Sequence, residues 1–114
     1  MPRRELAFSG YKSVWLFTMF DLPVKTKTDK RNYVRFRNLL LDSGFSQLQY
    51  SVYAQFCVSE EVAETHRRKI ERKLPPEGYV RFLSVTDRQF GKMVSFHGKS
   101  RTDVESKPSQ LMLF

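Results

Sequence analysis

Asp21 is the acidic residue whose position says most about chemistry. It lies within residues 13–23 (SVWLFTMFDLP), directly after an apolar run. Both faces of that run are apolar, as expected of a buried central strand. Asp21 is therefore expected at the end of a strand, where Pro23 keeps the next residues from extending the ladder. A carboxylate placed there is either a functional group or a turn residue, because Asp before Leu-Pro also favours turns.

A basic segment follows this strand. Six basic side chains lie within residues 25–37, and Asp29 is the one acidic residue among them. Arg31 and Arg35 are four residues apart, so on a helix they share a face, where like charges repel unless an anionic ligand lies near both. Lys and Arg that contact phosphates bind nucleic acid with little dependence on its sequence. The alternative is a solvated basic face without a partner. The candidate nucleic-acid-binding residues are Lys25, Lys27, Lys30, Arg31, Arg35 and Arg37.

Structural roles are expected for most other residues that could do chemistry. His66 lies on the apolar stripe of a helix, which favours a satisfied core histidine. Cys57, the single cysteine, falls in a strand pattern and is interpreted as a packed thiol. Glu64 precedes Arg67 and Arg68 by three and four positions, so pairing within the helix accounts for part of that charge. The sequence has no Walker loop, paired-cysteine motif or HExxH motif.

Length and composition indicate one small domain with a polyanionic partner. The chain has 114 residues and a net charge of +8. Its isoelectric point of about 9.9 lies in the range of nucleic-acid-binding domains. No segment approaches the roughly 20 apolar residues of a membrane span, and the first residues lack the pattern of a signal peptide. We therefore expect a cytoplasmic protein.

The elements that position these residues follow from periodicity. Thr28 precedes a predicted helix that runs to about Ser43, and Gly44 is the candidate C-cap. Residues 45–58 alternate with a period of two, which fits either one long strand or two strands with a break near Ser51. The apolar face of the first helix is expected to be core and comprises Tyr33, Phe36, Leu39 and Leu40.

The second half of the chain is predicted to hold a helix and further strands. Ser59 caps the helix, and a Pro-Pro-Glu-Gly segment ends it. Residues 79–86 form the next strand, Asp87 is interpreted as an Asx-type turn residue, and residues 93–96 form a brief last strand. Residues 99–110 are interpreted as a polar linker. The terminal LMLF, residues 111–114, is expected to dock on this domain or on a second copy, because four exposed apolar side chains are unfavourable in water.

With two strands between the helices, the order strand, helix, two strands, helix, strand is that of an α+β, ferredoxin-like βαββαβ sandwich. Residues 1–98 would form this domain, with both helices on one face of an antiparallel sheet. The first strand is apolar on both sides, so the other face of the sheet also needs a cover. A second subunit is the simplest cover for so short a chain, and we expect a homodimer through that face.

Several motifs in fixed order carry a family resemblance. MFDLPV after the apolar strand, TDKRNYVRFRNLLLDSGF, QYSVYAQF and FLSVTDRQFGKMVSFHG together resemble the CRISPR-associated adaptation protein Cas2, an endonuclease family, and particularly its type II branch. The resemblance covers about residues 12–98. It implies a ferredoxin-like fold, a symmetric dimer, and a central place in the spacer-acquisition complex with the CRISPR integrase, where double-stranded DNA lies across the dimer. It also favours breaking residues 45–58 into two strands near Tyr50 and Ser51.

The resemblance also assigns roles to residues. The family's aspartate at the end of the first strand falls on Asp21, which becomes the candidate catalytic and metal-binding residue, and the helix arginines fall on Arg31, Arg35 and Arg37. A hard carboxylate oxygen suits Mg²⁺ or another divalent cation, and two copies of Asp21 across a two-fold axis could share one hydrated ion. One carboxylate per chain is a sparse site, however, and no nearby residue is an obvious base. Two functions are expected: a DNA-binding scaffold for CRISPR adaptation with an Mg-dependent endonuclease activity, or a toxin-like metal-dependent endoribonuclease.

Overall fold

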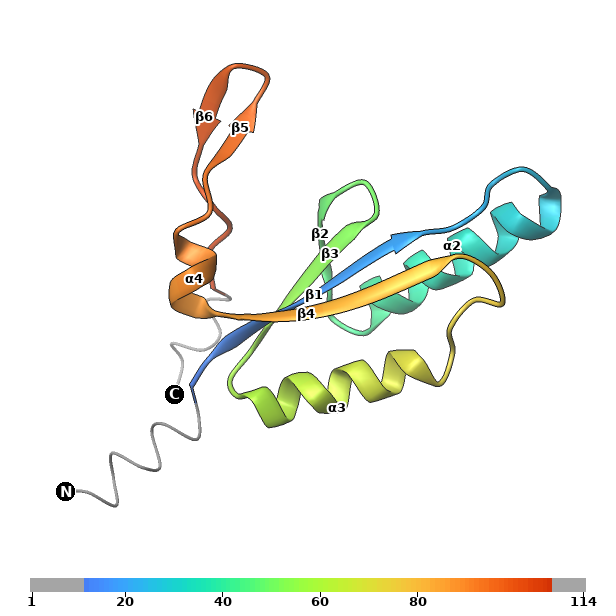
Figure 1. Cartoon of the computed structure of the whole chain (residues 1–114), viewed down its shortest axis with the longest axis horizontal. Helices are drawn as coiled ribbons and strands as arrows, with labels where there is room; N and C mark the ends of the chain where they lie inside the picture. The colour runs from blue at the N-terminus through green and yellow to red at the C-terminus, as the bar shows by residue number, and fades with distance from the viewer. Residues whose placement is uncertain (1–11, 108–114) are drawn as a thin grey trace.

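The computed structural model describes residues 12–107, which form a four-stranded antiparallel sheet, three helices and a small hairpin (Figure 1). The order of strands in the sheet is β2-β3-β1-β4. This α+β arrangement is consistent with the predicted ferredoxin-like fold. In chain order the elements are β1 (Val14–Asp21), α2 (Lys27–Asp42), β2 (Ser46–Gln49), β3 (Val52–Cys57), α3 (Glu60–Glu71), β4 (Tyr79–Thr86), α4 (Asp87–Gly91), β5 (Ser95–His97) and β6 (Ser100–Thr102).

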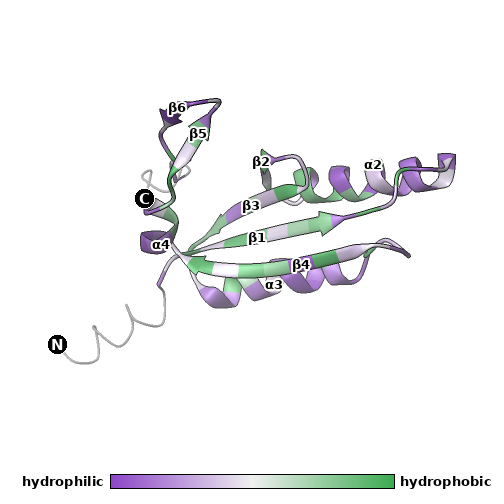
Figure 2. Ribbon diagram, turned by 45° about the horizontal axis from the view of Figure 1, so that its top comes forward, coloured by the Kyte–Doolittle hydropathy of each residue, from purple (hydrophilic) through white to green (hydrophobic). Residues whose placement is uncertain are grey.

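Strand β1 lies at the centre of the sheet, as its two apolar faces predict. It pairs antiparallel with β3 on one side and with β4 on the other. Figure 2 shows the apolar character of β1 along most of its length. Leu16 on one face and Trp15 on the other are both buried, and the exposed Asp21 ends the strand.

Helices α2 and α3 pack on the same face of the sheet. Phe36 and Leu40 of α2 and Ile70 of α3 join Leu16 and Phe20 of β1 in one buried cluster. Tyr33 and Leu39 are partly buried against that cluster, so the predicted core face of α2 is confirmed. The aromatic rings of Phe20 and Phe36 meet edge to face with centroids 5.1 Å apart, a favoured geometry. The common core fixes both helices relative to β1.

The run of residues 45–58 is divided into two strands. Tyr50 and Ser51 form the turn between β2 and β3, as the family resemblance favours. Ser51 has a φ of 71°, a left-handed conformation that ends the ladder without a glycine. Periodicity alone could not choose between one strand and two because neither Gly nor Pro marks this turn.

Helix α2 begins two residues earlier than predicted. Its N-cap is Thr26 and not Thr28. The Thr26 hydroxyl accepts a hydrogen bond from the Asp29 amide at 2.9 Å, and the Asp29 carboxylate accepts one from the Thr26 amide at 3.1 Å. This reciprocal capping box stabilises the earlier start. At the other end, Gly44 has a φ of 97° and follows the Ser43 cap.

The second face of the sheet is partly covered by the chain itself. The interpretation of Asp87 as a simple turn residue is wrong, because Asp87 begins the short helix α4, which Thr86 and Gln89 cap reciprocally. Phe90 of α4 stacks on Trp15 with ring centroids 4.0 Å apart, and Ala54 completes this second buried cluster. The chain thus supplies part of the cover that we expected from a second subunit.

The segment after α4 is more structured than predicted. The brief strand lies at Ser95–His97 instead of residues 93–96, and it pairs with β6. The interpretation of residues 99–110 as a linker is therefore wrong for Ser100–Thr102, and Val104 packs against the second cluster. Gly98, with a φ of 64°, allows the tight turn between the two strands. Residues 108–110 and the LMLF segment lie outside the described residues.

The described helices have one further property in common. None of them, within residues 12–107, is long and apolar enough to cross a membrane.

Candidate nucleic-acid interface and carboxylate site

Four basic residues of α2 form one row on the side of the helix that faces away from the core. Lys27, Lys30, Arg31 and Arg35 are all exposed and line one open hollow of about 720 Å³ along the helix. We call these four residues the basic row. Arg31 and Arg35 lie one helical turn apart, as predicted, and the buried Phe36 and Leu40 occupy the opposite side. The row presents four cations to a single ligand.

Among the described residues, no carboxylate forms an ion pair with the basic row, although Asp42, the last residue of α2, lines the same hollow. No ion pair within residues 12–107 involves a basic residue of α2. Asp29, the nearby acid, already accepts the Thr26 amide at the start of the helix. The net field over this part of α2 is therefore positive and available to a polyanion.

In helix α3, by contrast, two arginines form ion pairs with acidic residues of the same helix. Glu64 pairs with both Arg67 and Arg68 at 3.2 Å, and Arg67 also pairs with Glu71. The predicted pairing within this helix is confirmed. Because acidic residues of α3 balance the charge of these arginines, we do not place them in the interface.

The two remaining basic candidates lie apart from the row. Lys25 is exposed in the segment that leads into α2, just before the row begins. Arg37 is half-buried and does not line the hollow. It follows Arg35 by two positions, about 200° around a helix, which turns it to another side. Arg37 is therefore not part of the basic row.

Asp21 lies at the end of β1 with an exposed side chain. Its Cα partner on β4 is Tyr79. Met19, Tyr79 and Arg81 surround it at a small open cavity of about 190 Å³. No ion pair within residues 12–107 involves Asp21. The carboxylate is thus free for an external ligand.

Gly78 shapes this end of the strand, a role that sequence reasoning missed. A Cβ at Gly78 would lie 2.6 Å from the backbone oxygen of Asp21 and 2.8 Å from a methyl carbon of Leu22. Its φ of 97° also disfavours any other residue. The sequence placed Gly78 only at the end of a helix, because its contact with Asp21 depends on the pairing of β1 with β4.

Asp21 alone does not complete a metal centre. Within residues 12–107, no three His, Cys, Asp or Glu side chains gather in a way that could hold a metal ion. Mg²⁺ keeps several waters and is held by only one or two protein carboxylates together with substrate phosphates. An exposed, unpaired carboxylate fits one such position, and a second copy of Asp21 would supply the other.

Asp21 and the basic row lie on opposite faces of the sheet. Side chains of β1 alternate between the faces, and Leu16 and Phe20 point to the helices. Asp21 follows Phe20 and stands opposite Tyr79, so it belongs to the face without α2 and α3. The structure therefore does not bring the two predicted site elements together within one chain.

Cys57 and His66 belong to the core side of the molecule. Burial raises the pKa of the Cys57 thiol to about 11, so it stays protonated at neutral pH, in agreement with a packed thiol. Burial, and then the nearby charge of Lys69, lowers the pKa of His66. The expectation of a satisfied histidine is wrong in one respect: Nδ1 of His66 is buried without a hydrogen-bond partner among the described residues.

The sequence has clear relatives. The sequence model of the family described as CRISPR associated protein Cas2 matches residues 14–93. A protein of Paracidovorax avenae named "CRISPR-associated endoribonuclease Cas2" is 43% identical over 106 residues, which cover 93% of this chain and 98% of that protein.

Two further relatives carry the same name. The protein of Parvibaculum lavamentivorans is 46% identical over 101 residues, covering 89% of this chain and 100% of the relative. That of Flavobacterium psychrophilum is 41% identical over 104 residues, covering 91% and 90%. The similarity thus extends over nearly the whole of each protein.

Proposed function

Because this chain belongs to the CRISPR-associated Cas2 family, we propose that it serves CRISPR adaptation, or spacer acquisition, as a cytoplasmic homodimer that binds double-stranded DNA next to the CRISPR integrase. The observation that carries the proposal is the basic row, whose cations have no ion-pair partner in residues 12–107. Each Lys or Arg that neutralises a phosphate releases a counterion and so favours binding.

The row suits the backbone of a duplex and not the edges of its bases. Its four members are Lys and Arg, the usual partners of phosphate oxygens, and they line one open hollow along the outer side of α2. Contacts of this kind position a protein on DNA but do not read its sequence. We expect binding that depends on duplex form and salt concentration.

A second copy of the chain is the proposed cover for the rest of the open sheet face. Leu83 is 52% exposed and Tyr79 is 71% exposed, and both lie on the edge strand β4, opposite Phe17 and Asp21 of β1. Phe17 and Met19 are only partly buried on the same face. Burial of such a surface favours association by about 25 cal/mol per Å². A dimer through this face would bring two copies of Asp21 toward one axis.

The second candidate function is metal-dependent cleavage of a phosphodiester, and the exposed Asp21 favours it. The relatives are named endoribonucleases. Asp21 would hold Mg²⁺ through its carboxylate oxygens. When bound, such an ion polarises a phosphate and makes a coordinated water more acidic. The nearby Arg81 can balance the negative charge of a phosphate at the same cavity.

One set of measurements tests both functions on the purified chain. Sedimentation gives the oligomeric state, and fluorescence anisotropy gives the affinity for a labelled duplex at several salt concentrations. Incubation of labelled RNA and duplex DNA with Mg²⁺ gives the cleavage rate. Salt-dependent duplex binding by a dimer is the expected result. A monomer that ignores duplex DNA at low salt would overturn the scaffold, and cleavage without duplex affinity would favour the endoribonuclease.

A further inference from the structure

The four-stranded sheet contains only two charged residues, Asp21 in β1 and Arg81 in β4. Both line the cavity of about 190 Å³ at the end of β1, which we call the Asp21 cavity. Asp21 stands opposite Tyr79 and Arg81 stands opposite Met19, so these side chains share the sheet face without α2 and α3. The Cα atoms of diagonal neighbours in an antiparallel pair lie about 7–8 Å apart, within reach of a long side chain. The carboxylate and the guanidinium therefore belong to one site.

The two charges of this cavity do not neutralise each other directly. No ion pair in the described part of the chain, residues 12–107, involves Asp21 or Arg81. Both side chains are exposed, so a ligand can reach each of them from the solvent. Two unpaired and opposite charges suit a ligand that presents a cation to Asp21 and an anion to Arg81.

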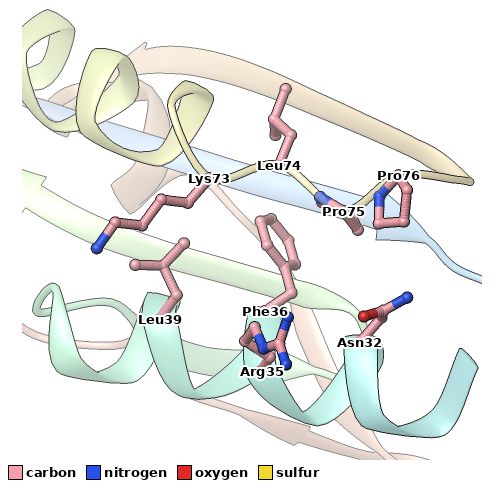
Figure 3. Close-up of a pocket in the computed structure, with 8 residues that line it drawn as sticks. All are labelled: Asn32, Arg35, Phe36, Leu39, Lys73, Leu74, Pro75 and Pro76. Atoms are coloured by element: carbon pink, nitrogen blue, oxygen red, sulfur yellow. The ribbon is translucent and has the colours of Figure 1, made fainter. Parts of the chain in front are cut away.

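The larger cavity between α2 and the segment that joins α3 to β4 lacks this combination (Figure 3). Its charged lining residues, Arg35 and Lys73, are both cations, and none of the lining residues in Figure 3 is acidic. Carboxylates are the protein groups that commonly hold Mg²⁺ beside substrate phosphates. The Asp21 cavity can therefore hold a divalent cation and a phosphate together, whereas the larger cavity has no carboxylate to do so.

We propose that Arg81 is the phosphate-binding residue of the Asp21 cavity, where one phosphodiester group lies between the Arg81 guanidinium and a divalent cation on Asp21. The inference rests on the proposed metal-dependent cleavage and gives Arg81 a direct bond to the substrate phosphate. The planar guanidinium can donate two parallel hydrogen bonds to the non-bridging oxygens of that phosphate. Arg81 thus fixes the phosphate relative to Asp21, and its own bond to the phosphate does not require the cation.

The first test measures binding and not cleavage. Its probe is a dinucleoside monophosphate, which carries one phosphodiester group and is too short to follow the basic row. NMR titration of the isotope-labelled chain with this probe in EDTA should shift the backbone amide signals of Asp21, Tyr79 and Arg81. Mg²⁺ should strengthen the binding to the unmodified chain. In Asp21→Asn, the metal-free binding should remain and the strengthening by Mg²⁺ should be lost.

Variants of Arg81 assign the phosphate to this side chain. Arg81→Gln should weaken the metal-free binding of the probe by at least about tenfold, the effect of losing a hydrogen bond to a charged group. Arg81→Lys keeps the charge but not the paired donors, so it should restore part of the affinity. Arg88→Gln is the matched control and should keep the affinity, because Arg88 is exposed on α4 and does not line the cavity.

The cleavage kinetics give a second readout. Arg81→Gln should raise KM for labelled RNA or DNA by about tenfold and change kcat little. A bond to the phosphate that the substrate and the transition state share lowers KM without raising kcat. A merely structural role of Arg81 would not produce this separation of KM from kcat, nor would Arg81→Lys restore it.

The outcomes separate this inference from the proposed function. Probe binding that depends on Arg81, in a chain that cleaves neither RNA nor DNA, supports the phosphate-binding role and contradicts the proposed cleavage. Cleavage and probe binding that Arg81→Gln leaves unchanged contradict the inference alone. If Arg81→Gln weakens the association of copies in sedimentation and leaves probe binding intact, Arg81 is an interface residue and the inference is wrong.

Discussion

Trp15 donates its indole Nε1–H to Oδ1 of Asp87 at 2.9 Å and so joins the start of β1 to the first turn of α4, 72 residues later. Oδ2 of the same carboxylate pairs with Lys107 Nζ at 3.0 Å. One side chain thus holds the central strand, the short helix and the segment beyond β6. The arrangement keeps Phe90 stacked on Trp15.

The hydrogen bond of Trp15 should contribute more to stability than the ion pair of Lys107. We expect Asp87→Ala to lower the free energy of unfolding by about 1–3 kcal/mol, because it leaves the donor of the buried Trp15 without a partner. Lys107→Ala removes a half-exposed ion pair and should cost at most about 1 kcal/mol. Urea denaturation of the two variants checks the order. Equal losses would show that the indole bond is not the main contribution.

Substitutions in the basic row should weaken DNA binding without regard to sequence. Arg31→Ala or Arg35→Ala should reduce affinity for unrelated duplexes by the same factor, and each should reduce the slope of log affinity against log salt by about 0.9. Anisotropy titrations at several salt concentrations measure both quantities.

Arg68→Ala is the matched control for those variants, since it removes one positive charge from an arginine paired with Glu64. It should change affinity and salt slope much less. An equal effect of Arg68→Ala would point to net charge alone, and a loss confined to one DNA sequence would contradict backbone recognition.

Asp21→Asn should separate cleavage from binding. If Asp21 holds Mg²⁺, the variant should lose cleavage by at least about 100-fold, the upper end of the loss seen when an outer partner of a metal site is removed. Duplex affinity should stay unchanged, because Asp21 lies on the other face of the sheet from the basic row. Labelled RNA and DNA with Mg²⁺ give the rate.

Asp103→Asn provides the control for charge, because Asp103 is exposed beyond β6 and lines neither the cavity at Asp21 nor the hollow along α2. Its cleavage rate should match that of the unmodified chain. Unchanged cleavage by Asp21→Asn would remove Asp21 from the catalytic role.

His66 should make the fold sensitive to mild acid. Its pKa is lower in the folded chain than the ordinary value of 6.5, so below that pH the unfolded chain binds a proton that the folded chain does not. Stability is fully present above pH 6.5 and falls as the pH drops through the folded pKa. His66→Leu should reduce this loss. Denaturation curves between pH 7 and 5, about the usual range of histidine titration, compare the two chains.

The sequence allowed correct prediction of features whose signal is local. The apolar run before Asp21 predicted a central strand, and the spacing of Phe36 and Leu40 predicted the core face of α2. The start of α2 was also readable, since Thr26 and Asp29 have the spacing of a capping box, but Thr28 competes as a cap.

Features that depend on pairing between distant residues could not be predicted. β6 has no apolar pattern, because its three residues, Ser100–Thr102, are all exposed and are ordered by backbone bonds to β5. Likewise, Tyr79 and Arg81 come beside Asp21 only through the register of β1 with β4. The role of Gly78 at the strand end follows from the same register.

The sheet separates Asp21 from the basic row. The proposed cleavage and the proposed binding would therefore depend on different faces of the protein. Under the proposed function, nucleic acid bound along α2 would not reach the Asp21 carboxylate of the same protomer, so a strand cut there would belong to another segment or another molecule. Loss of the Asp21 carboxylate would then abolish the proposed cleavage and leave the proposed binding of DNA to the basic row intact.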